Sequence, residues 1–246
     1  ATPERGIPAA GISAETAAAL TAGGPARLRL SIAAETAPRR TENLILDMPG
    51  RGAEWVVLSA HIDGHHLGES AMDNATGLAA ALSVAAVMAP NMATMARGLR
   101  VALFTVEEWA LAGSADYVDG LSTAERSAIK ADINLDTVAG SPNLTALTSD
   151  FAKLEAWLQA RAADHGFTLG AHRPLMANSD HYHFARHGIP AARIVAGFDE
   201  PDSVIKYVLT PGDTRATIAE ADLRTATGLA AALVAEACTA ETLELR

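Results

Sequence analysis

Trp55-Val-Val-Leu-Ser-Ala-His-Ile-Asp63 is the stretch from which the architecture of this chain can be worked out. It begins with an apolar run, residues 55–60, whose length is typical of a buried strand. His61 and Asp63 follow at the carboxyl end of that strand, two residues apart, so their side chains point to the same side. This spacing lets the Asp63 carboxylate orient the His61 imidazole.

Apolar runs of strand length alternate with longer helical patterns along the rest of the chain, which is typical of a mostly parallel sheet covered on both faces. The expected strands are residues 27–32, 43–48, 55–60, 99–105, 131–135 and 191–195. The expected helices are residues 74–89, 109–118, 151–165, 181–187 and 216–238. No repeat or low-complexity tract divides the chain. We therefore expect an α/β fold, with a mixed, mostly parallel central sheet and helices on both faces, in a single domain over residues 1–246.

The composition limits the partners of this chain. Its formal net charge is -10, and its 19 lysines and arginines are scattered, so it lacks the basic stripe that follows nucleic acid. The longest uncharged apolar stretch, residues 77–90, is shorter than the about 20 residues that cross a bilayer. Cys238 is the only cysteine, so no disulfide forms within the chain, and we expect it to be buried on the last helix. We expect neither nucleic acid nor a membrane as a partner, and the sequence leaves the oligomeric state open.

Further acidic side chains lie at the ends of predicted strands or the starts of predicted helices, namely Asp73, Glu107, Glu108 and Asp136. Singly, such residues are also typical of a helix cap or of a solvated helix start. Together they would meet at the edge of an open α/β sheet where ligands bind. Carboxylates combined with an imidazole are the ligands of hydrolytic zinc sites, so the set predicts a zinc centre with a position left for water.

Other catalytic mechanisms lack their signatures. The sequence contains no Gly-x-Ser-x-Gly motif, no evident histidine partner for Cys238, and neither a phosphate-binding loop nor a dinucleotide fingerprint after a strand. Serine, cysteine and nucleotide chemistry are therefore poor fits.

The chain resembles the family of co-catalytic zinc aminopeptidases, which includes secreted bacterial leucyl aminopeptidases, glutamate carboxypeptidases and glutaminyl cyclases. The resemblance extends from residue 43 to the C-terminal helix. The motifs that carry it are Ser59-Ala-His-Ile-Asp63, Ala71-Met-Asp-Asn-Ala-Thr-Gly77, Thr105-Val-Glu-Glu-Trp-Ala-Leu-Ala-Gly-Ser114, Asn134-Leu-Asp136, Ser179-Asp-His181 with Gly188-Ile-Pro190, and Thr210-Pro-Gly-Asp-Thr214. It implies a zinc exopeptidase fold and a hydrolase that acts on peptides, most directly an aminopeptidase that removes N-terminal residues.

The resemblance also implies a role for each site residue. The implied ligands are shared between two zinc ions: Asp73 bridges both, His61 and Asp136 complete one shell, and Glu108 belongs to the other. Glu107 is the general base, and Asp63 supports His61. Because adjacent residues at a strand end point in different directions, Glu108 can reach metal while Glu107 stays free to take a proton.

The last ligand departs from the family pattern. In the family a histidine directly precedes Thr-Pro-x-Asp-Thr, and in this chain that position is Leu209, which cannot bind zinc. One outcome is that another side chain replaces it, and the candidates for ligand or substrate contact are His65, His66, Glu69, His181 and His183. A second is an enzyme that works with one Zn2+ ion instead of two. A third is a non-catalytic or degenerate metal-binding domain on the same fold. Glutaminyl cyclase activity is disfavoured, because it needs the metal position that Leu209 impairs.

The first residues resemble part of another domain. Gly6-Ile-Pro-Ala-Ala-Gly-Ile-Ser13 is similar to the closing strand of the protease-associated lid that relatives insert before the catalytic domain. Residues 1–25 are therefore expected to be a remnant of that lid, or else a short leading strand and loop. The family also implies a periplasmic or secreted location, although no signal segment is visible.

Overall fold

The computed structural model describes residues 10–24, 27–33 and 37–246. The chain divides into two units, residues 1–40 and 41–246, and each is described by itself. The first contains the helix α1 (Ala14–Thr21), which begins where the Ser13 hydroxyl accepts a hydrogen bond from the Thr16 amide at 3.1 Å.

Two expectations concern this first unit. The strand expected over residues 27–32 is wrong, because this exposed segment has no strand partner among the described residues. The lid remnant expected over residues 1–25 includes residues 1–9 and 25, which lie outside the described residues. It stays a prediction, as does the single domain over residues 1–246.

A seven-stranded mixed sheet forms the centre of the second unit. In chain order its strands are β1 (Leu44–Met48), β2 (Trp55–His61), β3 (Gly98–Phe104), β4 (Ile129–Leu135), β5 (Leu144–Leu147), β6 (Leu169–His172) and β7 (Ala191–Ala196). Their order across the sheet is β1-β3-β2-β4-β7-β5-β6. β1 is antiparallel to β3 and β5 is antiparallel to β7, whereas the other pairings are parallel. The predicted mixed, mostly parallel sheet is confirmed, and β5 and β6 are additional to the expected strands.

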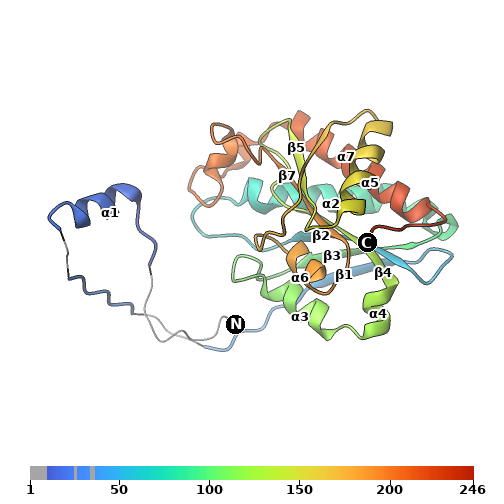
Figure 1. The fold of residues 1–246 in the computed structure, drawn as a ribbon, viewed down its shortest axis with the longest axis horizontal. Coiled ribbons are helices and arrows are strands. Elements are labelled where there is room, and N and C mark those ends of the chain that lie inside the picture. Colours follow the sequence, from blue (N-terminus) through green and yellow to red (C-terminus); the bar gives the residue numbers. More distant parts are fainter. Residues whose placement is uncertain (1–9, 25–26, 34–36) are drawn as a thin grey trace. The chain divides into compact units, whose positions relative to one another are not determined.

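Helices cover both faces of this sheet (Figure 1). On one face lie α2 (Thr76–Met88), α5 (Ala152–Asp164) and α7 (Glu220–Thr239); on the other lie α3 (Ala112–Gly120), α4 (Thr123–Ala128) and α6 (His181–Arg186). Short 3-10 helices are η3 (Val204–Tyr207) and η4 (Arg215–Thr217). β2 is buried on both sides: Leu58 joins the core cluster under α2 and α7, and Val57 joins a second cluster with Phe184. Cys238 is buried on α7, as expected.

The helical stretch Ala71–Thr94 is longer than the apolar stretch of residues 77–90 that the sequence indicated. It combines η1 (Ala71–Ala75), α2 and η2 (Ala89–Thr94), and with 24 residues and a mean hydropathy of 1.4 it could cross a membrane by length and composition alone. The expectation that every apolar stretch is too short is therefore wrong, because the helical geometry continues beyond residues 77–90. The side of α2 that carries Ala81 and Val84 is buried in the core of the second unit, which is ordinary for a core helix. The absence of a membrane partner stays a prediction.

The parallel strands β2, β3 and β4 all end at the same edge of the sheet. The loops that follow them therefore leave the sheet side by side, and they carry the predicted site residues. Gly77 brings the start of α2 against this edge, because a Cβ on Gly77 would overlap the Leu135 carbonyl oxygen at the end of β4. The segment that precedes α2 is thereby placed next to the segment that follows β4.

Candidate metal centre

His61 lies at the middle of the side chains that meet at this edge. On one side of its buried ring, Nδ1 is 3.1 Å from the Asp63 carbonyl oxygen and 3.5 Å from Asp63 Oδ1. On the other side, Nε2 is 3.0 Å from Asp73 Oδ1, 3.8 Å from Asp136 Oδ1 and 4.0 Å from Glu107 Oε2. A hydrogen bond donated by Nδ1 to Asp63 turns Nε2 toward the carboxylates. This is the orientation that a metal-binding imidazole needs.

Asp73 is held in place through its own backbone and that of its neighbours. η1 departs from helical geometry at Asp73 and Asn74, and the peptide bond between them is cis. The buried Asp213 carboxylate accepts hydrogen bonds from the amides of Met72 at 2.7 Å and Asp73 at 3.2 Å. Asp213 belongs to the Thr-Pro-Gly-Asp-Thr motif that the sequence already shows. Its hydrogen bonds with the amides of Met72 and Asp73 could not be predicted from that motif.

Asn74 connects the start of α2 to the end of β4. Its Nδ2 donates to the Leu135 carbonyl oxygen at 2.9 Å, and its Oδ1 accepts from the amides of Gly77 at 3.0 Å and Thr137 at 3.2 Å. The sequence pattern suggests an ordinary helix cap at this position. The structure shows instead that Asn74 ties two ligand-bearing segments together.

Asp136 is almost fully buried directly after β4. Its Oδ1 lies 3.1 Å from Arg193 Nη2 and accepts a hydrogen bond from Thr137 Oγ1 at 2.9 Å. Burial raises the pKa of Asp136, but Arg193 and His61 lower it by more, so this carboxylate stays ionised. Arg193 is not among the sequence candidates; the only available signal is a charged residue within the otherwise apolar strand β7.

Asp63 fixes the backbone that carries the two glutamates. Its Oδ1 accepts from the Glu107 amide at 3.1 Å and its Oδ2 from the Glu108 amide at 3.3 Å. Burial, followed by the charge of Asp136, raises the pKa of Glu107 to about 9. Burial and the charge of Asp73 raise the pKa of Glu108 to about 7, and Glu108 Oε1 is buried without a hydrogen-bond partner. The two adjacent side chains therefore have different surroundings, as expected for residues that point apart.

The chemistry of these donors fits a zinc ion. His61, Glu107 and Asp136 offer ligand atoms that all lie within 4.8 Å of one another, and Asp73 Oδ1 is next to the same imidazole nitrogen. An imidazole and several carboxylates are ligands that zinc takes in proteins, and the excess of negative charge favours a cation. Within the described residues, no other group of histidine, cysteine, aspartate or glutamate side chains meets the same geometric condition. The group contains Glu107 and not Glu108.

The candidate replacements in the loop after β2 are engaged elsewhere or exposed. His65 Nδ1 accepts a hydrogen bond from the Leu67 amide at 3.1 Å, and the side chain of His66 is exposed. Glu69 accepts from the backbone amide of Arg215 at 2.8 Å and from its Nε at 3.1 Å. None of these three joins the His61 group.

The two candidates on α6, His181 and His183, are buried and do not belong to the His61 group. His181 is fully buried, and burial together with the charge of Arg193 lowers its pKa to about 3. Both of its ring nitrogens are buried without a hydrogen-bond partner among the described residues. The ring of His183 packs edge-on against Tyr182, and burial followed by the charge of Arg186 lowers its pKa. Their use as ligands or substrate contacts stays a prediction.

Leu209 lies in a segment that the structure holds against the centre. Its backbone is left-handed, with φ 59°, and its side chain is 51% exposed. The following turn is closed by the Asp213 amide, which donates to the Thr210 carbonyl oxygen at 3.1 Å, and the Asp213 side chain binds the backbone next to Asp73. Leu209, which stands where the family has histidine, is therefore four residues before Asp213, which is anchored at the site. The leucine side chain offers no ligand atom.

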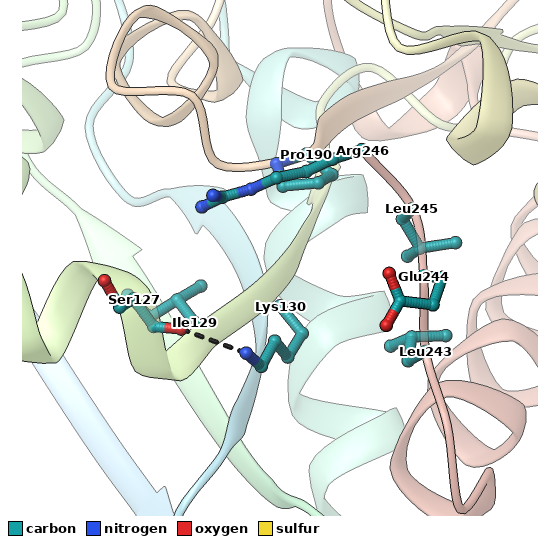
Figure 2. A pocket seen from close by; sticks show the side chains of 8 residues that line it. All are labelled: Ser127, Ile129, Lys130, Pro190, Leu243, Glu244, Leu245 and Arg246. Carbon is teal, nitrogen blue, oxygen red and sulfur yellow. Dashed lines mark hydrogen bonds between the residues drawn. The ribbon is translucent and has the colours of Figure 1, made fainter.

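Two cavities differ in their relation to this centre. One of about 330 Å³ is lined by His61, Asp63 and residues of the loop that follows, and it continues to Leu78 on α2. Another of about 280 Å³ lies where β4 begins and β7 is about to begin, and Figure 2 shows it between Lys130, Pro190 and the C-terminal residues. The second cavity is at the amino ends of the strands, away from the His61 group.

Comparison with known proteins agrees with this arrangement. Residues 43–234 match the model of Peptidase family M28. Aminopeptidase YwaD of Bacillus subtilis (strain 168) is 30% identical over an alignment of 243 residues that covers 94% of this chain and 52% of that protein. A solved zinc aminopeptidase from Bacillus subtilis has a TM-score of 0.71 at 28% identity over 81% of this chain and 50% of that one. An aminopeptidase from Aneurinibacillus sp. strain AM-1 has a TM-score of 0.71 at 25% identity over 83% and 50%.

The chain spans about half the length of these relatives. The matched segment nevertheless includes all seven strands of the described sheet and the whole His61 group. With the matching motifs at the ends of β2, β3 and β4, this coverage leads to one conclusion: the chain belongs to Peptidase family M28.

Proposed function

We propose that this chain is a zinc-dependent exopeptidase, specifically an aminopeptidase that removes N-terminal residues from peptides with Glu107 as the general base. The main support is the position of His61 Nε2, which lies within 4.0 Å of three carboxylates at the carboxyl edge of the sheet. The relatives described above are called aminopeptidases, and one is called a zinc aminopeptidase. A peptide with a free N-terminus is therefore the proposed substrate.

In this proposal His61, Asp73 and Asp136 hold zinc. When bound, zinc lowers the pKa of a water molecule and polarises the scissile carbonyl group. Glu107 takes the proton of the attacking water and passes it to the departing amine. In the protein without metal, burial and the charge of Asp136 raise the pKa of Glu107 to about 9, and a bound cation would lower it toward the operating pH that suits a general base.

Asp63 acts as a positioning residue in the same proposal. Its carboxylate holds the Glu107 amide, and its carbonyl oxygen accepts from His61 Nδ1. The base and the imidazole are thereby kept at a constant separation while a proton moves.

The substitution Glu107→Gln tests the proposed base. We expect turnover of an N-terminal aminoacyl anilide to fall at least about 100-fold, because the amide cannot accept the proton, while zinc content and thermal stability are retained. Glu220→Gln is the matched control, because Glu220 is an exposed carboxylate on α7, and it should keep full turnover. Unchanged turnover in the Glu107 variant would sink the assignment of this base.

A second candidate, a non-catalytic or degenerate metal-binding domain, is favoured by one observation: Leu209 has no ligand atom. Wild-type protein that holds zinc but does not hydrolyse any of a panel of aminoacyl anilides and dipeptides would favour this second function over the first.

A further inference from the structure

The side chains around His61 are sufficient for one zinc ion. His61 Nε2 faces Asp73 and Asp136, which makes three protein ligands of the kind that a catalytic zinc site uses. Arg193 keeps Asp136 ionised, and Asp213 and Asn74 hold the backbone around Asp73. Each of these ligands therefore has a supporting contact that sets its direction.

The side of Asp73 that faces Glu108 does not offer a comparable set. Glu108 is close enough to Asp73 for that charge to raise its pKa, but unlike Asp73, whose Oδ1 is 3.0 Å from His61 Nε2, it makes no ion pair with the His61 imidazole. Asp73 and Glu108 together are one ligand short of the three that catalytic zinc usually has. The position that would supply the third is Leu209, and its segment is anchored by Asp213.

Nearby side chains are poorly placed to make up the difference. The hydrogen bond that His65 Nδ1 accepts from the Leu67 amide leaves the proton of a neutral ring on Nε2, so Nε2 is not free to bind a metal. Arg215 holds the Glu69 carboxylate, and neither ring nitrogen of His181 reaches the Asp73 or Glu108 carboxylate within hydrogen-bond distance.

Glu108 Oε1 nevertheless points into buried space without a donor. A buried carboxylate oxygen without a partner is unfavourable, and the free energy is recovered when a charged donor reaches it. The α-ammonium group of a peptide carries both a positive charge and three N–H donors, as a lysine ammonium does.

We propose that this chain binds one zinc ion, at His61, Asp73 and Asp136, and that Glu108 receives the α-ammonium group of the substrate instead of a second zinc ion. This inference rests on the proposed aminopeptidase function. The amine nitrogen and the carbonyl carbon of one residue are roughly 2.5 Å apart, as its bond lengths and angle require. The group that binds the amine must therefore lie near the group that acts on the carbonyl, and Asp63 holds the backbone amides of Glu107 and Glu108 on one carboxylate.

The first test counts zinc by elemental analysis and native mass spectrometry after dialysis in the presence of excess zinc. Wild-type protein should hold one zinc ion per chain, and Leu209→His should hold two, because it restores the histidine that directly precedes Thr-Pro-x-Asp-Thr in the family pattern. Leu82→His is the control, since Leu82 on α2 is 49% exposed and similar to Leu209 in exposure, and it should hold one. Thermal unfolding shows that each variant is folded.

The second test measures binding of L-leucinamide and of N-acetyl-L-leucinamide by calorimetry, with zinc-loaded protein carrying Glu107→Gln so that no turnover occurs. Adding Glu108→Gln should weaken leucinamide binding at least about tenfold, a loss typical of a charged hydrogen bond, and leave one zinc ion per chain. The affinity for the acetylated compound, which has no ammonium group, should be equal in both proteins.

The outcomes separate the parts of the inference. Two zinc ions in the wild type, none at all, or loss of zinc on Glu108→Gln would overturn the single ion and the role of Glu108. A single ion in folded Leu209→His would overturn the explanation from Leu209. Equal leucinamide affinities would overturn the ammonium site. Both tests are independent of turnover, so an inactive protein with one ion and an ammonium site would refute the proposed activity alone.

Discussion

His61 shows how single residues set the chemistry of this centre. Burial lowers its pKa, but hydrogen bonds with Asp136, Asp63 and Asp73 raise it by more, so the pKa lies well above the ordinary value. In the metal-free protein both ring nitrogens of His61 therefore carry a proton at neutral pH, and the ring is positively charged. Zinc needs the neutral ring, so this proton must leave when the ion binds.

We predict from this that zinc affinity increases as the pH rises from 6 to 8, with release of protons. The sign follows from the raised pKa of His61 and from that of Glu107, about 9, because both groups hold protons that compete with the ion. Calorimetry in two buffers with different ionisation enthalpies measures the number released. Equal apparent enthalpies in the two buffers, or affinity independent of pH, would contradict the prediction.

The residues that provide donors could be named from the sequence, whereas their supports could not. His61, Asp63 and Asp136 each follow a recognisable apolar strand, so their meeting at one edge follows from parallel pairing. Arg193 and Asp213 act through contacts with residues far away in the chain. No local pattern encodes such contacts, because they arise only when the segments pack.

At the scale of elements, long apolar segments were predictable and short ones were not. β2 is buried on both faces and begins with a continuous apolar run, whereas β4 is equally buried although it contains Asp132 and Asn134. β5 and β6 have four residues each, too few for a periodic pattern, and they are strands because they pair with each other and with β7. Residues 27–32 have a strand-like composition without such a partner, and composition alone does not make a strand.

The C-terminal end of α7 depends on one buried cation. Arg97, only 5% exposed in its side chain, donates from Nη1 to the carbonyl oxygens of Ala237 at 3.3 Å and Ala240 at 2.5 Å, and from Nε to Glu54 at 2.8 Å. These carbonyl groups lack partners within the helix, and a cation is favourable at this end.

We predict that Arg97→Met lowers the free energy of unfolding by about 3 kcal/mol, because it leaves the buried carbonyl groups at the helix end without their charged donor, while Glu54 keeps Lys130 at 2.9 Å. Arg51→Met is the control: Arg51 pairs with Glu241 at 3.1 Å on the surface, and its loss should cost about 1 kcal/mol or less. Urea unfolding followed by circular dichroism measures both. Equal losses in the two variants would contradict the assigned role of Arg97.

At the scale of the whole molecule, the order of the strands in the sheet could not be predicted from local sequence patterns. The central position of β2 between β3 and β4 requires crossovers, and the reversals at β1 and β5 depend on the length and path of the connections. What could be predicted was the class of architecture, because alternation of strand and helix patterns is a property of the chain as a whole.

The metal centre joins segments that are far apart in the sequence, which leads to a prediction for global stability. Zinc that binds only the folded state should stabilise it by about 2.7 kcal/mol at a free concentration one hundred times the dissociation constant. We therefore expect a chelator to lower the midpoint of thermal unfolding and added zinc to restore it. His61→Ala should abolish the shift, and His66→Ala, at an exposed histidine in the same loop, should retain it. A shift that persists in the His61 variant would place the stabilising ion elsewhere.

The double attachment of Asp63 has a consequence for how this centre can diversify. The Asp63 carboxylate accepts hydrogen bonds from the backbone amides of Glu107 and Glu108 and also lies beside the His61 imidazole. The distance between the ligand His61 and the base Glu107 therefore depends on this one side chain. A change at Asp63 would alter the positions of His61 and of the two glutamates together, whereas a change at loop residues that contact neither Asp63 nor the ligands would leave these positions as they are. Adaptation to new substrates would therefore proceed through the loops, while the reacting geometry remains constant from one specificity to the next.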